Sequence, residues 1–264
     1  MLSYRGIHLD TEVHTDHTVL LLHAFPLSSE MWNTQLSMLE KQGIPALAPD
    51  VFGVEGSPEK KSWTFSDYVA EIDLLLSSLD IGRVTVVGLS MGGYQAFELW
   101  RMFPEKVASL VLCDTKAEHD NEGALAGRRD FIRAVKTGGA HEAIERMLPN
   151  VFASDTYLSG TDAVESFKKI VNKQPGEVIA ATMQAIASRV DSCDSLETIN
   201  CPVTFITGKE DKLTPPTLAE AMQRNVPGSV LHIIPKAGHI SNMEQPDVFN
   251  DLLLDHLEKA GLTP

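Results

Sequence analysis

The chain has little cysteine, few aromatic residues and no long apolar run. Cysteine occurs only at Cys113, Cys193 and Cys201, and aromatic residues make up 6% of the 264 residues. Three scattered cysteines without a Cys-x-x-Cys pair support neither a disulfide framework nor a zinc site. The apolar stretches, such as residues 19–22, fall far short of the roughly 20 residues that a transmembrane helix needs. We therefore expect neither a disulfide-stabilised, a zinc-binding nor a membrane-spanning protein.

Basic residues are scarce relative to acidic ones. The chain has 22 Lys and Arg against 36 Asp and Glu, which gives a net charge of −14. No Lys- or Arg-rich stretch offsets this balance, and nucleic acids and anionic membranes require concentrated positive charge. The first residues, MLSYRGIHLD, also lack the charged and then apolar regions of an export signal. We expect no nucleic-acid partner, no membrane partner and a cytoplasmic location.

What the chain does have is a regular alternation of two kinds of segment, which predicts an α/β fold with a largely parallel sheet. Short runs rich in Leu and β-branched residues predict buried strands at 18–23, 45–49, 83–89, 107–113, 203–207 and 230–234. Amphipathic segments predict helices at 28–42, 65–79, 92–103, 217–225 and 246–259. Residues 2–14 are expected to form a hairpin at the edge of the sheet.

The alternation breaks once, between residues 117 and 200. Apolar residues there recur at spacings of three and four, which is typical of helices, and no convincing strand is present. We interpret this segment as a helical cap inserted into one domain. The expected organisation is a core domain of residues 1–116 and 201–264 with a cap of residues 117–200.

The sequence GLSMGG, residues 88–93, lies where an apolar run ends and an amphipathic segment begins. It matches the Gly-x-Ser-x-Gly nucleophile elbow, in which a serine occupies a strained turn between a strand and a helix. The alternative is an ordinary tight turn, but the strand before the motif and the helix after it favour the elbow. Ser90 is therefore the candidate nucleophile.

A serine nucleophile needs a histidine to take its proton and an acid to orient that histidine. His239 follows the predicted strand 230–234, and Asp211 follows the predicted strand 203–207. The chain order Ser, Asp, His is the order of an α/β-hydrolase triad. Glu210 and Asp114 are rivals for the acid, and Asp114 is the more serious because it also follows a strand, at 107–113.

Attack on an ester creates an oxyanion, which two backbone N–H groups must stabilise. The residue after the nucleophile, Met91, provides one of them. The second is expected from the loop after the first buried strand, where Phe25 is the candidate because Pro26 has no N–H. His23 in the same loop is interpreted as a structural histidine.

Five segments together resemble the α/β-hydrolase superfamily: HAFPLS, DVFGVEGSP, GLSMGG, TGKEDKLTP and AGHISNMEQP. Within it, the chain is similar to the cofactor-free group of 3-oxoadipate enol-lactonases, non-haem haloperoxidase-type esterases and carboxylesterases. The resemblance implies a mostly parallel, eight-stranded sheet flanked by helices, with a helical cap. It also implies the roles of its matching residues: Ser90 as nucleophile, Asp211 as acid, His239 as base, and Phe25 with Met91 as the oxyanion pair.

Two positions depart from the pattern of these relatives. Glu55 occupies a position that is usually glycine, and it adds negative charge near the cap. Ala24 stands where glycine is frequent in the oxyanion loop. Neither departure concerns the triad.

The residues and the resemblance together predict a serine hydrolase that cleaves small carboxylic esters and requires no metal or organic cofactor. A lactonase, of the 3-oxoadipate enol-lactone or acyl-homoserine lactone type, is the nearest alternative, followed by a perhydrolase and a carbon–carbon bond hydrolase. A slow or non-catalytic receptor for a small ligand is the alternative from a different class. The protein is expected to be a monomer or a homodimer.

The substrate is expected to lie between the core and the cap. Beyond Phe25 and Met91, the apolar residues that are candidates for the pocket wall are Leu27, Trp32, Met147, Phe152 and Ile240. A substrate with a carboxylate group would need a cationic contact, for which the cap offers Arg128, Arg129 and Arg133.

Overall fold

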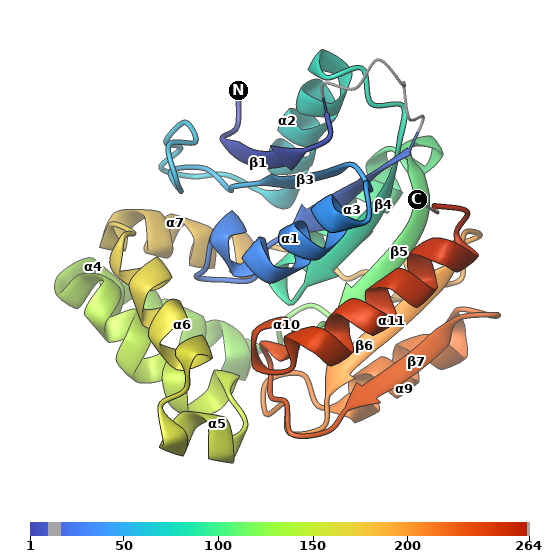
Figure 1. Cartoon of the computed structure of the whole chain (residues 1–264). Helices are drawn as coiled ribbons and strands as arrows, with labels where there is room; N and C mark the ends of the chain where they lie inside the picture. The colour runs from blue at the N-terminus through green and yellow to red at the C-terminus, as the bar shows by residue number, and fades with distance from the viewer. Residues whose placement is uncertain (10–16, 263–264) are drawn as a thin grey trace.

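The computed structural model describes residues 1–9 and 17–262, and it is built around one twisted sheet of seven strands (Figure 1). The spatial order of the strands is β1-β3-β2-β4-β5-β6-β7. The strands are β1 (Tyr4–Ile7), β2 (His17–Leu22), β3 (Ala46–Pro49), β4 (Arg83–Leu89), β5 (Val107–Cys113), β6 (Val203–Gly208) and β7 (Val230–Ile234). β1 pairs antiparallel with β3, and every other pair is parallel.

The mostly parallel α/β sheet that the sequence predicts is confirmed, and all six buried runs form strands. The sheet has seven strands in the described residues, one fewer than the eight that the resemblance implies. The expected edge hairpin is found only in part. β1 does lie at the edge, but it pairs with β3, and the second half of the hairpin falls on residues 10–14, which lie outside the described residues.

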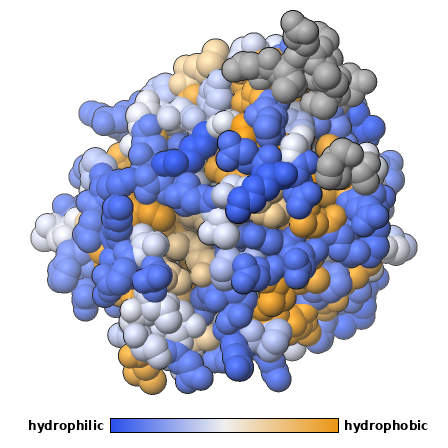
Figure 2. Space-filling view, in the orientation of Figure 1, coloured by the Kyte–Doolittle hydropathy of each residue, from blue (hydrophilic) through white to orange (hydrophobic). Residues whose placement is uncertain are grey.

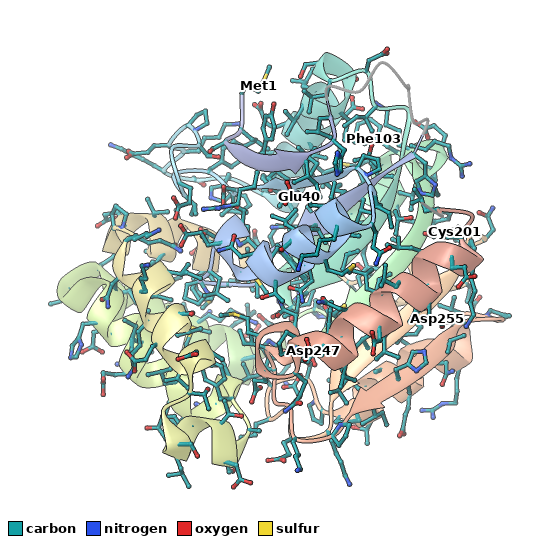
Figure 3. All side chains as sticks on the ribbon, in the orientation of Figure 1. Met1, Glu40, Phe103, Cys201, Asp247 and Asp255 are labelled. Atoms are coloured by element: carbon teal, nitrogen blue, oxygen red, sulfur yellow. The ribbon has the colours of Figure 1, made fainter. Side chains whose placement is uncertain are left out.

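Helices cover the sheet and bury apolar side chains. Those of the core are α1 (Asn33–Lys41), α2 (Phe65–Ser78), α3 (Met91–Met102), α9 (Pro216–Asn225), α10 (Ser241–Glu244) and α11 (Pro246–Lys259). The buried side chains lie on one face in α11 and on all sides in α3. In α11 the buried residues Phe249, Leu253 and Leu257 repeat every four positions, whereas Asp247 near its start is exposed (Figure 3). α1 and α11 lie side by side over the near face of the sheet in Figure 1.

The predicted helical insertion is also present, at the left of Figure 1. It consists of α4 (Glu122–Val151), which is broken at Gly139, α5 (Ser154–Ser159), α6 (Asp162–Asn172) and α7 (Gly176–Ala187), and the short α8 (Cys193–Leu196) follows. α4 and α7 pack closely at Gly176. A Cβ at this position would lie 2.3 Å from the carbonyl oxygen of Val135, so the close approach requires glycine. Lys173 joins the insertion to the core through ion pairs with Glu30 at 2.6 Å and Glu55 at 3.4 Å.

Hydrophilic residues cover most of the face seen in Figure 2. In the part of the chain that the structure describes, no helix combines the length and the apolar character needed to span a bilayer.

Candidate active site

Ser90 occupies a sharp turn between β4 and α3. Its backbone has φ 56° and ψ −109°, a conformation that is strained for a residue with a side chain. Its neighbours must be small: a Cβ at Gly88 would lie 2.4 Å from the carbonyl oxygen of Gly92, and a Cβ at Gly92 would lie 2.0 Å from that of Leu22. The strand, turn and helix that the GLSMGG sequence predicts are therefore present, and the turn holds Ser90 at the carboxyl end of the sheet.

A chain of hydrogen bonds joins Ser90 to residues that follow two other strands. His239 Nε2 lies 2.7 Å from Ser90 Oγ, and His239 Nδ1 lies 2.8 Å from Asp211 Oδ2. His239 is nearly completely buried in the loop after β7, and its backbone N–H donates to the carbonyl oxygen of Val151 at 2.9 Å. In this geometry Nδ1 donates to Asp211, which leaves Nε2 free to accept the Ser90 proton.

The Asp211 carboxylate is fixed by donors on the turn that follows it. The N–H groups of Leu213 and Thr214 donate to Oδ1 at 2.8 and 3.0 Å, and the Thr214 hydroxyl donates to Oδ2 at 2.6 Å. Burial alone would raise the pKa of Asp211, but the charge of His239 and the hydrogen bonds outweigh burial and lower that pKa to about 2. Asp211 is therefore ionised at neutral pH.

The charge of Asp211 acts in turn on His239. Burial alone would lower the pKa of His239, but the charge and the hydrogen bond of Asp211 raise it above the ordinary value for histidine. A base with a raised pKa holds a proton more firmly, which suits a group that must take one from a serine.

Asp114, the rival acid, lies nearby but is bonded elsewhere. Its Oδ1 accepts from the N–H of Gly208 at 2.7 Å, and its Oδ2 accepts from the Ser241 hydroxyl at 2.5 Å. Burial and the negative charge of Asp211 raise the pKa of Asp114. The structure brings Asp211 to His239 and leaves Asp114 as a buried neighbour that is bonded to Gly208 and Ser241. Glu210, the other rival, is exposed.

The two candidate oxyanion donors are the backbone N–H groups of Phe25 and Met91. Among the described residues, neither the N–H of Phe25 nor that of Met91 donates a hydrogen bond to another protein atom. The loop that carries Phe25 is held by His23, whose Nδ1–H donates to the carbonyl oxygen of Ala24 at 3.0 Å while its Nε2 accepts from the N–H of Val51 at 3.2 Å. His23 therefore has the structural position that the sequence suggests.

Ser90 opens into a cavity of about 330 Å³ between the core and the insertion. Phe25, Met91 and Met147 line it. Four other residues expected on its wall lie in the hydrophobic core instead: Leu27, Trp32, Phe152 and Ile240. Trp32 packs against Phe249 with ring centroids 6.1 Å apart, and Phe152 packs against Phe167 at 5.7 Å.

The cavity wall also contains polar residues that the sequence did not indicate. Of the three cap arginines considered, Arg128 lines the cavity, while Arg129 and Arg133 do not. The residues missed include Tyr94 on α3, Lys116 and Asp120 between β5 and α4, and Arg146 on α4. The position of Lys116 just after β5 is a signal that could have identified it, because ligand-binding residues follow strands in such sheets.

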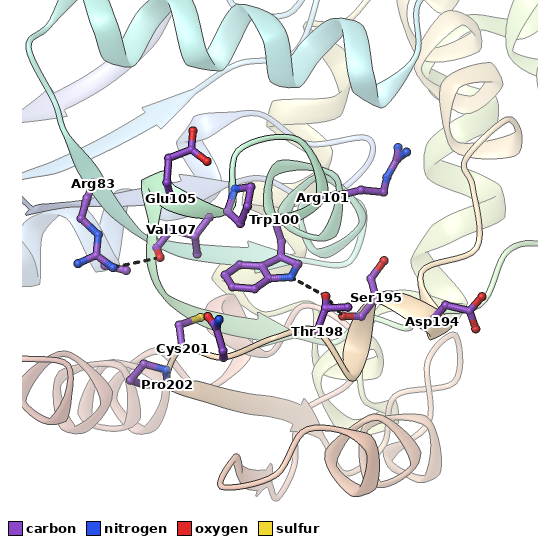
Figure 4. Close-up of a pocket in the computed structure, with 13 residues that line it drawn as sticks. Arg83, Trp100, Arg101, Glu105, Val107, Asp194, Ser195, Thr198, Cys201 and Pro202 are labelled. Atoms are coloured by element: carbon purple, nitrogen blue, oxygen red, sulfur yellow. Dashed lines mark hydrogen bonds between the residues drawn. The ribbon is translucent and has the colours of Figure 1, made fainter.

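A larger hollow of about 780 Å³ lies far from these residues, at the starts of β4 and β5 (Figure 4). Two of the polar side chains that line it are already bonded to the protein. Trp100 Nε1 donates to Thr198 Oγ1 at 3.0 Å, and Arg83 Nη2 donates to the carbonyl oxygen of Val107 at 3.4 Å. Its lining holds no histidine, so the Ser90 cavity is the candidate active site.

The fold and the Ser90 turn define the class of this protein. Residues 19–252 match the Alpha/beta hydrolase family, and the chain belongs to that family. The resemblance seen in the sequence is thereby confirmed.

Its relatives include proteins of three kinds. A thermophilic esterase from Thermogutta terrifontis is 31% identical with a TM-score of 0.90, and the match covers 98% of this chain and 93% of that one. The 3-oxoadipate enol-lactonase 2 of Acinetobacter baylyi is 29% identical over 181 residues, 68% of this chain and 66% of its own. A bromoperoxidase from Bacillus anthracis shares the fold with a TM-score of 0.82 and is 22% identical. The match covers 97% of this chain and 94% of that one.

Proposed function

We propose that this hydrolase cleaves small carboxylic esters through an acyl-enzyme intermediate on Ser90. The observation that carries the proposal is the unbroken chain from Ser90 Oγ through His239 to Asp211, at 2.7 and 2.8 Å, which opens on the 330 Å³ cavity. The likeness to the T. terrifontis esterase supports the same activity.

In the first step, Ser90 Oγ attacks the ester carbonyl carbon while His239 Nε2 accepts the hydroxyl proton. Asp211 stabilises the imidazolium that forms and keeps Nδ1 protonated. The carbonyl oxygen becomes an oxyanion, which accepts hydrogen bonds from the N–H groups of Phe25 and Met91. His239 then gives its proton to the leaving alcohol, and the acyl group remains on Ser90.

In the second step, His239 takes a proton from water, and the resulting hydroxide attacks the acyl carbon. The second oxyanion uses the same two N–H groups. When it collapses, Ser90 recovers its proton from His239 and the carboxylic acid leaves. A cavity of this volume is at the lower end of the range for small-molecule sites, which favours short acyl and alkyl groups over polymers.

A lactonase is the second candidate, because the chain is also similar to the enol-lactonase of A. baylyi. The steps are the same, except that the alcohol stays attached to the acyl group after the ring opens. The residues that would carry it are therefore also the same.

Initial rates of the wild type and of Ser90→Ala test both candidates. The substrates are p-nitrophenyl acetate, butyrate and octanoate, an enol-lactone and an acyl-homoserine lactone. We expect turnover that Ser90→Ala abolishes, and the preferred substrate separates esterase from lactonase. Turnover that survives in Ser90→Ala, or no turnover of any substrate, would contradict the proposal.

A further inference from the structure

The cavity next to Ser90 has a positively charged wall, although the whole chain has a net charge of −14. Its lining contains three cations, Lys116, Arg128 and Arg146, and one carboxylate, Asp120. Arg146 is already paired with Asp130 at 2.8 Å and with Glu142 at 3.1 Å on the outer surface. Arg128 is bonded to Asp120, but Arg189 and Lys116 share that single carboxylate. The unbalanced positive charge that faces the cavity therefore comes from Lys116 and Arg128 together.

These two cations belong to a cluster that is built around Asp120. The Asp120 side chain is 1% exposed and pairs with Arg128 and with Arg189, whose Nη2 lies 2.8 Å from Oδ1. Lys116 Nζ lies 3.7 Å from the same oxygen, beyond hydrogen-bonding distance. Glu118 adds a second negative charge that acts on Lys116, so the cluster holds three cations against two carboxylates.

The three cations of the cluster differ in burial and in whether they reach the cavity. Arg189 is 3% exposed, donates to the carbonyl oxygens of Ile186 and Glu118, and stacks on the Tyr94 ring at 4.4 Å, so it is a structural residue. Lys116 and Arg128 are each 22% exposed and reach the cavity. Burial and the neighbouring Arg189 lower the pKa of Lys116, which shows that its charge is poorly balanced by the protein alone.

A half-buried cation without a full partner is costly, and an anion in the cavity removes that cost. We infer that the substrate carries a carboxylate, which Lys116 and Arg128 bind while the ester or lactone carbonyl lies at Ser90. The substrate class is thus an acidic ester, such as a half-ester of a dicarboxylic acid or a carboxylated lactone. This inference rests on the proposed function, because it names the substrate of the same site.

Matched pairs of esters that differ only in charge test the inference. One pair is monomethyl glutarate and its neutral carboxamide, methyl 4-carbamoylbutanoate, with the charge on the acyl side. The other is the butyric ester of glycolic acid and that of glycolamide, with the charge on the alcohol side. We expect kcat/KM for the acid of at least one pair to exceed that of its amide about tenfold to a hundredfold, which is typical of hydrogen bonds to charged groups.

Variants locate the charge that is responsible. Lys116→Gln removes the less constrained cation and leaves Asp120 paired with both arginines, and we expect it to bring the ratio of acid to amide close to one. Arg128→Gln is expected to reduce the same ratio. Arg129→Gln is the matched control, because it lies next to Arg128 on α4 but is exposed and outside the cavity, and its ratio should equal that of the wild type.

Binding to Ser90→Ala separates this inference from the proposed function. Calorimetry with the same four esters requires no turnover, and we expect an acid to bind about tenfold or more tightly than its amide, with the difference lost when Lys116→Gln is added. If no ester is hydrolysed, the proposed function fails while the binding result still decides the inference. Equal binding and equal rates within both pairs, or a preference that Lys116→Gln leaves intact, would overturn it.

Discussion

The hollows at the two ends of the sheet differ in volume and in chemistry, and the smaller one is the candidate active site. At the amino ends of β4 and β5, the 780 Å³ hollow around Arg83 and Trp100 has polar groups that are bonded to their neighbours (Figure 4). At the carboxyl ends, the 330 Å³ cavity contains Ser90 and His239. Loops that leave parallel strands at the carboxyl end converge, so side chains from different strands meet there. Position on the sheet is therefore a better guide to the site than volume.

The largest expected effect is the loss of the Ser90 hydroxyl. Ser90→Ala should lower kcat/KM by about 10⁴-fold or more, because no other group can form the acyl-enzyme. Arg83→Gln, at the opposite end of the sheet, should change it less than about twofold, since surface changes away from a site have small effects. Comparable losses in the two variants, measured as initial ester hydrolysis, would break the distinction between the ends.

The next effect distinguishes the two acids at the carboxyl end. Asp211→Asn should lower kcat by about 10³-fold, because Nδ1 of His239 loses the partner that fixes its tautomer. Asp114→Asn should cost less than about tenfold, since an amide can still accept from Gly208 and donate to Ser241. The reverse ranking in steady-state kinetics would assign the acid to Asp114.

A third prediction concerns the turn that presents Ser90. Gly92→Ala should lower the free energy of unfolding by about 3 kcal/mol, because the added Cβ would lie 2.0 Å from the carbonyl oxygen of Leu22. Gly127→Ala on α4 is the matched control. Nothing lies within 4 Å of its Cβ, so the same change should stabilise the protein by about 0.5 to 1 kcal/mol. Urea unfolding measures both, and a tolerated Gly92→Ala would refute the close approach.

The smallest effect is the pH dependence, which follows from His239. Only neutral His239 can accept the Ser90 proton, so kcat/KM should fall about tenfold per pH unit below its pKa. Because Asp211 raises that pKa, the midpoint should lie above 6.5, the ordinary value for histidine. A profile from pH 5 to 9 with a neutral ester measures it. A midpoint below 6.5 would mean that burial outweighs the effect of Asp211.

The sequence predicted the strands and the Ser90 turn well because both depend on local patterns. Six buried runs and the spacing of Gly88, Ser90 and Gly92 are readable in one dimension. His239 and Asp211 followed from the position of each after a strand, since parallel strands bring those positions together.

The cavity wall was harder to predict because it depends on packing between distant segments. Trp32 looked like a pocket residue, but it packs on Phe249, more than 200 positions away in the chain. Apart from Arg128, the charged wall was missed for the same reason, because Asp120 is paired with Arg189, which lies 69 positions later in the chain. Local patterns cannot show such a meeting.

The most direct test of the central claim is to trap the covalent intermediate. A fluorophosphonate reacts with an activated serine, and mass spectrometry of a tryptic digest locates the label. Ser90 is the only serine in the tryptic peptide of residues 84–101. We predict one stoichiometric label on this peptide in the wild type and none in Ser90→Ala. An unlabelled peptide in the wild type, or a label that persists in Ser90→Ala, would contradict the assignment of Ser90 as the nucleophile.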